Sequence, residues 1–301
     1  NTYTNQTIVE NGTLWLDEDY NLGEPPGAFS WNHLLLRGYN GWQKIMFTNT
    51  MTLHANRGIF LQATNINLDV ADGVTVTYNG VIDGVTNAAN QHEGRVAKLG
   101  AGRLVLGGES TFTNQLFIDN GEVKLTAAGN PLASDWVDVG DDGGASSPEV
   151  HLILGAGIDM QSQVHIRTNE ACATESRYIR MEDEGSAVII GDVRLSDRAI
   201  ISNVANSTLT LRKIWQSGDG FCLIKQGAGT ITLYTNDFSH LTNEAGVVKL
   251  ACHDGWHDWN HLFLASGSSW DLNGFTGTVA CVDGAGNVDL STGGVLRVGA
   301  G

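Results

Sequence analysis

Hydrophobic and polar residues alternate in short runs along most of this chain. In the stretch 103–106 the apolar alternation is carried by Leu104 and Leu106, and in 121–125 by Val123 and Leu125. A period of two is typical of a β-strand that buries one face, and β-branched residues dominate many of these runs. No stretch shows a convincing helical period, and glycines stand where the chain has to turn. The pattern predicts an all-β chain of short strands.

The alternating pattern repeats over a long distance. The sequence KLGAG that begins at Lys98 returns as KQGAG at Lys225, and both copies close on a Gly-x-Val-Lys-Leu segment. Long-range repetition favours stacked coils over a sandwich or a propeller, and parallel connections of this kind are right-handed. We therefore expect a right-handed parallel β-solenoid that forms a single domain over 1–301. A more irregular passage at about 17–50 is expected to be an inserted segment whose aromatic residues pack against the stack.

Composition narrows the class of protein. The chain has 38 glycines but 4 prolines, and 42% of its residues are hydrophobic, which predicts a chain folded throughout. A formal net charge of −16 speaks against binding to nucleic acid or to an anionic membrane. No apolar run is long enough for a membrane span, and Asn1 is not followed by a basic and apolar leader, so we expect neither a membrane span nor a signal peptide in this sequence.

Four cysteines are present, and none of them forms a CxxC pair. Metal binding through cysteine is therefore not expected. Because a solenoid coil takes roughly 20–30 residues, Cys252 and Cys281 are expected at similar positions on adjacent coils, within reach of a disulfide. Cys172 with Cys222 is a second, weaker pair. The alternative is that the cysteines are buried thiols that serve as small apolar residues.

A histidine cluster is the most conspicuous candidate for a metal site. It consists of His253, His257 and His261. A spacing of four would place the three imidazoles on one face of a helix, where they could bind a divalent metal. Gly255 and the flanking strands favour a loop instead, packed by Trp256 and Trp259, and a sugar-stacking or partner surface is a third possibility. We expect no metal here.

Two acidic clusters are candidates for calcium binding or for paired-carboxylate chemistry on glycans. They are Asp135, Asp138, Asp141 and Asp142 in the first, and Glu182, Asp183 and Glu184 in the second. The first cluster lacks the twelve-residue calcium-loop pattern, and no basic group stands at a fixed spacing from either. We interpret both as solvated loop charge. No Gly-x-Ser-x-Gly elbow or other nucleophile signature is present, so we expect no catalytic residues, no cofactor and no enzymatic activity.

The lysine-glycine blocks resemble a known repeat family. The segments 98–106 and 120–125 follow the pattern K-x-G-x-G-x-L-x-L with a G-x-x-x-L close, and they resemble the autotransporter-associated β-strand repeat, also called the passenger-associated transport repeat. Residues 58–126 look like one whole unit, 1–16 like the tail of another, 225–250 like a third and 270–301 like the opening of a fourth, whereas 17–50 and 130–215 match poorly. The resemblance implies a right-handed parallel β-solenoid on bacterial secreted or surface proteins, and it brings no catalytic residues.

These observations predict an extracellular or bacterial cell-surface protein with a structural or adhesive role. Neither end of the sequence has a polar cap, so we expect head-to-tail self-association into a filament. The residues expected at the junction are Asn1, Tyr3, Leu14, Leu16, Val295, Leu296 and Val298. The alternative for the ends is a longer chain whose further coils supply the caps. The alternatives for function are a passenger domain that binds surface glycans or other surface proteins, and a β-helix carbohydrate-active enzyme.

Overall fold

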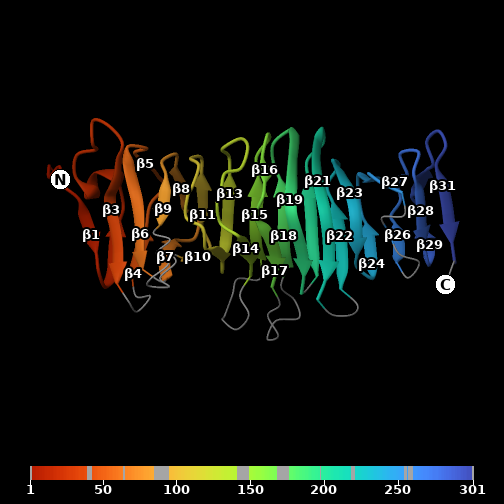
Figure 1. The fold of residues 1–301 in the computed structure, drawn as a ribbon, viewed down its shortest axis with the longest axis horizontal. Helices are drawn as coiled ribbons and strands as arrows, with labels where there is room; N and C mark the ends of the chain where they lie inside the picture. The colour runs from red at the N-terminus through yellow and green to blue at the C-terminus, as the bar shows by residue number, and fades with distance from the viewer. Residues whose placement is uncertain are drawn as a thin grey trace.

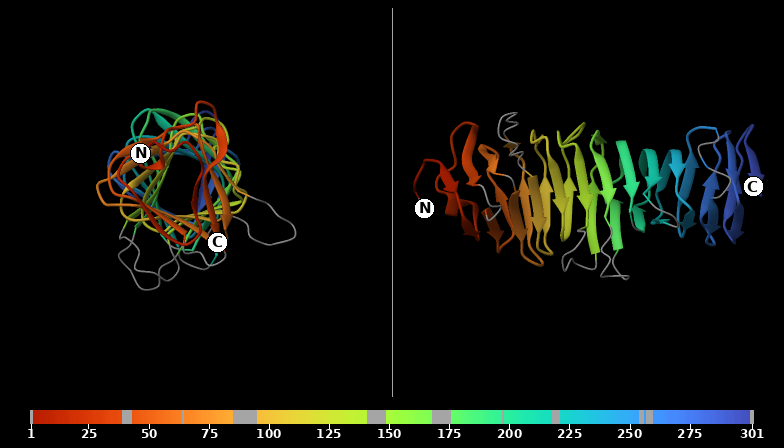
Figure 2. Two further views of the ribbon diagram at one scale, coloured as in Figure 1. Left: turned by 90° about the vertical axis from the view of Figure 1, so that its left-hand side faces the viewer. Right: turned by 60° about the horizontal axis from the view of Figure 1, so that its bottom comes forward.

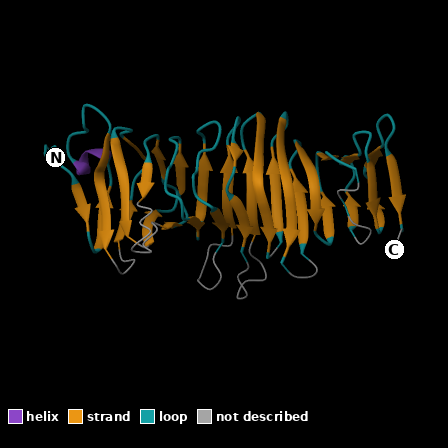
Figure 3. Ribbon diagram, in the orientation of Figure 1, coloured by secondary structure: helices purple, strands orange, loops and turns teal. Residues whose placement is uncertain are grey.

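The chain winds into an elongated stack of coils. The computed structural model describes residues 2–38, 43–63, 65–84, 95–140, 149–167, 176–196, 198–217, 221–253, 256 and 260–299. The coils follow one another from the N-terminal to the C-terminal end of the stack (Figure 1). Viewed along the stack, the strands wrap around a common interior (Figure 2). Apart from a single 3-10 turn, η1 (Asp19–Leu22), the regular elements of the described residues are strands (Figure 3).

Two long parallel sheets carry most of the stack. The long sheet contains, in order, β2 (Gly12–Leu16), β4 (Gln43–Phe47), β7 (Asn65–Val70), β10 (Arg95–Leu99), β12 (Gln115–Ile118), β14 (Trp136–Val139), β17 (Gln163–Ile166), β19 (Gly185–Leu195), β21 (Ser207–Gln216), β23 (Thr230–Asp237), β25 (Val247–Leu250), β27 (Ser269–Asp271) and β30 (Asn287–Asp289), with β16 (Asp159–Met160) beside β19. The second sheet contains, in order, β5 (Met51–Leu53), β8 (Thr75–Tyr78), β11 (Arg103–Leu106), β13 (Gly121–Leu125), β15 (Glu149–Leu154), β18 (Ser176–Met181), β20 (Ala199–Asn203), β22 (Cys222–Gln226), β24 (His240–Asn243), β26 (His261–Leu264) and β29 (Cys281–Gly284).

Two shorter sheets lie near the ends of the stack. The N-terminal one contains β1 (Thr7–Val9), β3 (Ser30–Gly38), β6 (Arg57–Ala63) and β9 (Ile82–Gly84), and the C-terminal one contains β28 (Thr276–Val279) and β31 (Val295–Val298). Their strands pair in parallel, as do those of the long sheets. The predicted all-β parallel solenoid is confirmed.

The interior is built from rows of apolar side chains that run from coil to coil. Alternation places every second residue of a strand inside, and parallel register then puts like positions on top of one another. One such row of the second sheet is Leu104, Val123, Leu152, Ile179 and Ile201. All five side chains are buried and belong to one hydrophobic cluster that runs through the stack. Each coil is therefore stabilised mainly by its two neighbours.

The lysines of the repeated block lie inside the stack. Lys98 stands in register between Leu68 and Ile118, and its side chain is fully buried. Its Nζ donates to the carbonyl oxygens of Leu99, Gly100 and Asn120 at 2.9, 2.7 and 3.0 Å. These bonds hold the turn of its own coil and tie that turn to the next one. Burial lowers the pKa of Lys98 to about 7, against the opposing effect of nearby carboxylates.

The second copy of the block reproduces this arrangement. Lys225 is also fully buried, and its Nζ donates to the carbonyl oxygens of Gln226, Gly227 and Ala245 at 2.7, 2.6 and 3.1 Å. Burial lowers the pKa of Lys225 to about 8. The Lys-x-Gly-x-Gly pattern is therefore a turn motif in which a buried ammonium group satisfies backbone carbonyls.

The segment expected to be an irregular insertion is instead part of the coil. Strand β3 pairs with β1 and β6, and β4 lies between β2 and β7 in the long sheet. The irregular sequence before β3 forms a cap over Arg57, which is buried and donates to the Asp19 carboxylate at 2.9 Å and to the Leu22 carbonyl at 3.0 Å. The expected aromatic packing is present for Trp31, which meets Phe60 edge-on with ring centroids 4.7 Å apart.

Candidate functional site

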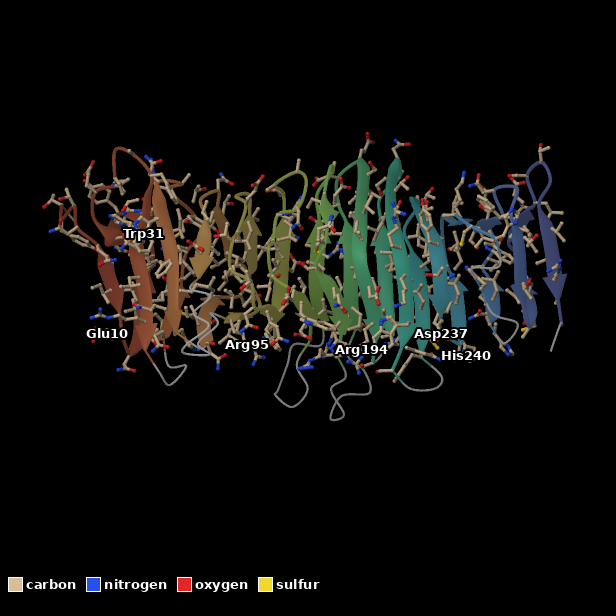
Figure 4. All side chains as sticks on the ribbon, viewed as in Figure 1. Glu10, Trp31, Arg95, Arg194, Asp237 and His240 are labelled. Carbon is tan, nitrogen blue, oxygen red and sulfur yellow. The ribbon has the colours of Figure 1, made fainter. Side chains whose placement is uncertain are left out.

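A row of polar and aromatic side chains follows the outer face of the long sheet. Register aligns one outward-facing position on six consecutive strands of that sheet, β12 to β23. We call this the outer row, and its members are Phe117, Asp138, His165, Arg194, Trp215 and Asp237. Arg194 and Asp237 mark its course along the lower edge of the stack in Figure 4. Because parallel strands lie about 4.8 Å apart, side chains on neighbouring strands of this row are within contact distance.

Strand alternation determines which side chains face outward here. In β14 the residues Val137 and Val139 are buried in the core, so Asp138 between them points to the outer face. In β17 the same argument applies to His165, because Val164 and Ile166 are inside. An acid and an imidazole are thereby placed side by side without any local sequence motif.

Asp138, His165 and Ser196 form a hydrogen-bonded series. The His165 Nδ1 lies 3.2 Å from Asp138 Oδ1, and the His165 Nε2 lies 2.8 Å from Ser196 Oγ. Ser196 directly follows the end of β19, and its Oγ lies 2.6 Å from the Oγ of Ser217 on the next coil. The tautomer assigned from these partners carries its proton on Nδ1, toward the carboxylate. Nε2 is then the acceptor for the serine hydroxyl.

The carboxylate at the start of this series is shielded from solvent. The side chain of Asp138 is 2% exposed and that of His165 is 10% exposed, whereas Ser196 is half-buried. The guanidinium of Arg167 approaches Asp138 Oδ1 at 3.4 Å through Nε, and this cation offsets part of the cost of burying the acid. Exposure thus increases from the acid to the serine.

Aromatic and cationic groups surround the series. Trp136 stands two residues before Asp138, on the same face, and its ring meets the His165 ring with centroids 6.5 Å apart. Arg194, the neighbour of His165 in the outer row, lies over the Trp215 ring at 5.0 Å from its centroid. Beside Trp136 is a shallow hollow with a largely polar lining. Its polar and aromatic lining residues include Asn130, Asp135, Trp136, Gln161 and Gln163.

The interpretation of the first acidic cluster needs correction. Asp138 is a buried strand residue rather than a solvated loop charge, because it lies between His165 and Arg167 on the outer face. Asp135 is exposed, and Asp141 and Asp142 lie outside the described residues.

The second acidic cluster also has basic neighbours, which the sequence did not reveal. Glu182 pairs with Arg103 at 2.9 Å and with Arg180 at 3.5 Å, and Asp183 pairs with Lys124 at 2.8 Å. Arg103 on β11 and Lys124 on β13 belong to earlier coils and are far away in sequence, whereas Arg180 on β18 is two residues before Glu182. The cluster is an ion-paired surface. Glu184 accepts a hydrogen bond from Asn206 at 3.1 Å.

The predicted disulfide between Cys252 and Cys281 is not formed. Cys252 follows β25 of the long sheet, whereas Cys281 begins β29 of the second sheet, so the two residues lie on different faces of the coil. The Cys252 thiol donates to the Tyr234 carbonyl at 2.9 Å. The expected spacing of one coil does not hold here: the local coils take 22 residues from Val247 to Ser269 and 20 from His261 to Cys281, so Cys281 lies more than one coil beyond Cys252. The second pair involves Cys172, which lies outside the described residues.

The histidine candidates do not meet at one point. The His253 Nδ1 accepts a hydrogen bond from the Thr276 amide at 3.0 Å, whereas His261 begins β26, with its Nδ1 3.0 Å from Cys281 Sγ. His257 lies outside the described residues, as does Trp259. Across the part of the chain that the structure describes, no group of three or more His, Cys, Asp or Glu side chains is arranged to hold a metal ion.

Trp256 packs into the core, as one of the alternatives for this region predicted. It is 2% exposed, stacks on Trp270 with ring centroids 5.0 Å apart and meets Phe238 edge-on at 5.7 Å. A buried aromatic stack of this size contributes strongly to the packing of the coils around it.

Most of the residues predicted for self-association lie on terminal strands; Tyr3 precedes β1, and Asn1 is outside the described residues. Leu14 and Leu16 belong to β2, an edge strand of the long sheet, and Val295, Leu296 and Val298 belong to β31, an edge strand of the C-terminal sheet. Tyr3 is half-buried, and its hydroxyl lies 2.6 Å from Thr7 Oγ1. The sequence reasoning therefore identified the terminal strands but missed the Asp138–His165–Ser196 series. The signal that could have found it is the spacing of about one coil between an acid, a histidine and a serine.

Comparison with known proteins adds one finding. The family model of the passenger-associated transport repeat matches residues 1–16, 96–125 and 223–242. No curated protein and no solved structure matches the chain. Among the residues that the structure describes, no helix has the length and apolar character that crossing a membrane requires. The matched segments contain β1 and β2, most of β10 with β11 to β13, and most of β22 and β24 with β23 between them, so each of them contributes strands to the stack. The chain therefore carries passenger-associated transport repeats, as the lysine-glycine blocks of the sequence predicted.

Proposed function

We propose that this protein is an extracellular β-solenoid of a bacterial cell surface, with a structural or adhesive role, whose stacks associate end to end. The repeats support the location, since passenger-associated transport repeats belong to proteins of the autotransporter passenger type. The observation that supports the end-to-end contact is the exposure of apolar side chains on the terminal strands. Val298 stands in register with the fully buried Val279 but is 53% exposed.

Both terminal faces of the described stack present apolar side chains and strand edges. At the C-terminal face Val295 is exposed, and β31 pairs only with β28 among the described strands. At the N-terminal face Leu14 is half-buried although it stands in register with the fully buried Ile45, and β2 pairs only with β4 among the described strands. A further parallel coil would cover such a face and pair such an edge.

A second copy of the chain is the partner that we propose for these faces. The coils at both ends wind around one common interior, as the view along the axis shows (Figure 2), and each end carries a short third sheet. The C-terminal face of one copy can therefore continue into the N-terminal face of another. The contact is heterologous and does not close, so it propagates into a filament. This structural role requires no catalytic step.

Electron microscopy and light scattering of the purified chain test this proposal. Filaments are expected for the wild type and are expected to be lost in Val298→Lys, because the substitution places a charge on the face that is covered at each junction. Ile190→Lys is the matched control, since Ile190 is 37% exposed but lies on β19, in the middle of the long sheet. Uniform single rods from the wild type would refute end-to-end association. Filaments that persist in Val298→Lys would refute this junction.

A further inference from the structure

We propose that Ser196, His165 and Asp138 form a hydrolytic site for carboxylic esters on the outer face of the long sheet. The site is independent of the end-to-end contact, because it lies in the middle of the stack on β14, β17 and the end of β19. The geometry has the order that acyl transfer requires: a hydroxyl at 2.8 Å from one imidazole nitrogen, and a carboxylate at 3.2 Å from the other.

The distribution of burial separates this series from an ordinary polar ladder. A ladder on a solenoid surface needs only mutual hydrogen bonds, and its members would be solvated alike. Here Asp138 is 2% exposed, and its Oδ2 has no hydrogen-bond partner among the described residues, whereas the serine at the other end is half-buried. Burial of the acid fixes the imidazole in one tautomer, and exposure of the serine leaves its Oγ accessible to a substrate.

The backbone amides of the two serines do not stabilise the developing oxyanion. The amides of Ser196 and Ser217 donate to Ile166 and Leu195 in the sheet, each at 2.9 Å, and are not available. Arg194 stands next to His165 in the outer row, and its buried Nε has no partner among the described residues. A guanidinium beside the reacting carbonyl supplies both charge and N–H donors. Arg194, whose guanidinium lies over the Trp215 ring, therefore supplies positive charge beside His165 that favours a developing oxyanion.

Hydrolysis proceeds in two balanced steps. Ser196 Oγ bonds to the carbonyl carbon and its proton passes to His165 Nε2, and the tetrahedral intermediate then collapses as the bond to the alcohol oxygen breaks and that oxygen takes the proton. A water molecule next attacks the acyl group on Ser196 and gives its proton to Nε2. The bond to Oγ breaks, Ser196 recovers the proton, and the carboxylic acid leaves. One ester and one water yield one acid and one alcohol, while Asp138 orients the imidazole throughout.

The surroundings indicate the kind of ester. The hollow beside Trp136 combines an aromatic ring with the amide groups of Asn130, Gln161 and Gln163. An aromatic face with hydrogen-bonding amides suits a polar ring compound that has an apolar face and hydroxyl groups. We therefore assign O-acylated sugars as the substrate class, with the acyl carbonyl at Ser196 and the sugar extending along the outer face toward the hollow.

The chemistry is tested with a fluorophosphonate probe and with 4-nitrophenyl acetate on the full chain. Peptide mapping is expected to place the label on Ser196, and Ser196→Ala is expected to lose both labelling and hydrolysis. His165→Gln is expected to slow both by about a hundredfold or more, because it removes the general base. Asp138→Asn keeps the size of the acid, and it is expected to slow both reactions as well. Thermal unfolding of each variant identifies any that fails to fold.

The matched control is Ser202→Ala, since Ser202 is a half-buried serine of β20 whose neighbours in register are Arg180 and Gln226. It should label and hydrolyse like the wild type. Equal hydrolysis by Ser196→Ala and wild type, or a label on another residue, would overturn the site. Equal labelling of His165→Gln and wild type would show that the hydrogen bonds of this series are structural only. Release of acetate from glucose pentaacetate, dependent on Ser196 and reduced in Trp136→Ala, tests the substrate class; full activity in Trp136→Ala would refute the assignment of the hollow.

Discussion

The buried lysines of the repeat predict an unusual dependence of stability on pH. Lys98 is fully buried, and burial lowers its pKa from 10.5 to about 7. In the unfolded chain the lysine recovers its ordinary pKa, so between these two values the unfolded state binds more protons than the folded state. Stability must therefore rise with pH over this range. Below the folded pKa both states are protonated, and the full cost of burying the ammonium group is present.

The size of the effect follows from the pKa shift. One unit is worth about 1.4 kcal/mol, so integrating the proton uptake from about pH 7 to about pH 9 gives a gain of about 2 kcal/mol from Lys98. Lys225, with a pKa of about 8 in the folded state, gives about 1 kcal/mol over the same range by the same integration. The two lysines occupy the same position in two copies of one motif, and the stability gained between about pH 7 and about pH 9 should be larger for Lys98 than for Lys225.

Substitution by methionine isolates each contribution. Lys98→Met keeps the apolar stem but removes the titrating group and the donors to the Leu99, Gly100 and Asn120 carbonyls. Carbonyls left without a donor where water does not reach cost about 1–3 kcal/mol each, so we expect a loss of about 3 kcal/mol in the free energy of unfolding at high pH. At neutral pH the loss should be smaller by about 2 kcal/mol, since the wild type there still buries a charge.

Urea unfolding of wild type, Lys98→Met and Lys225→Met at several pH values measures these differences, because the other titrating groups cancel in each comparison. A direct titration of the lysine ε-carbons by NMR provides the pKa values independently. The hydrogen bonds of Lys98 oppose the effect of burial on its pKa, because three carbonyl oxygens around Nζ match the three protons of an ammonium group. A difference between wild type and Lys98→Met that does not change with pH would mean that these carbonyls keep the lysine charged, and it would refute the argument from burial.

Three further outcomes follow from the packing. Gly100→Ala should destabilise the fold by clearly more than Gly73→Ala: both glycines have a φ near +70°, at 72° and 71°, but a Cβ at Gly100 would stand 2.2 Å from a backbone carbonyl whereas none stands within 4 Å at Gly73, and thermal unfolding compares them. Trp270→Ala should cost about 3–5 kcal/mol and remove the near-ultraviolet signal of the stacked tryptophans. Non-reducing peptide mapping should recover Cys252 and Cys281 in separate peptides, and a linked peptide would contradict the positions found here.

The sequence predicted those features that depend on local periodicity. Alternation at Leu104 and Leu106 predicted a strand because period two has one structural meaning for a short run bounded by glycines. The repeated lysine-glycine block predicted the turn, although not the burial of Lys98, because a lysine at the end of a short strand has the same sequence signature whether it is buried or solvated. Lys98 is buried because the next coil covers it, and that coil also supplies the Asn120 carbonyl.

The predictions that were wrong depend on how many residues each coil contains. The passage 17–50 was taken for an insertion because its polar and proline-containing turns interrupt the alternation, yet β3 and β4 rejoin their sheets in register. Cys252 and Cys281 were paired by counting residues, but the local coils are shorter than the spacing between them, which places the two residues on different sheets. The position of a residue around the solenoid depends on the lengths of all the turns before it, and the alternating pattern of the strands does not determine turn lengths.

The same property of the fold explains why a site of this kind leaves no motif. In a stacked coil the neighbour of a residue is the residue at the same position one coil away, about 4.8 Å distant, however many residues separate the two in sequence. An acid and a histidine therefore need only occupy one outward position on adjacent coils, and a serine the next outward position one coil further on, to come within hydrogen-bonding distance. Substitution at outward positions leaves the apolar core unchanged, so a polar series can be assembled there one residue at a time. The solenoid scaffold and the Asp138–His165–Ser196 series are thus separable, and Ser196→Ala should abolish hydrolysis while leaving the stack and its filaments intact.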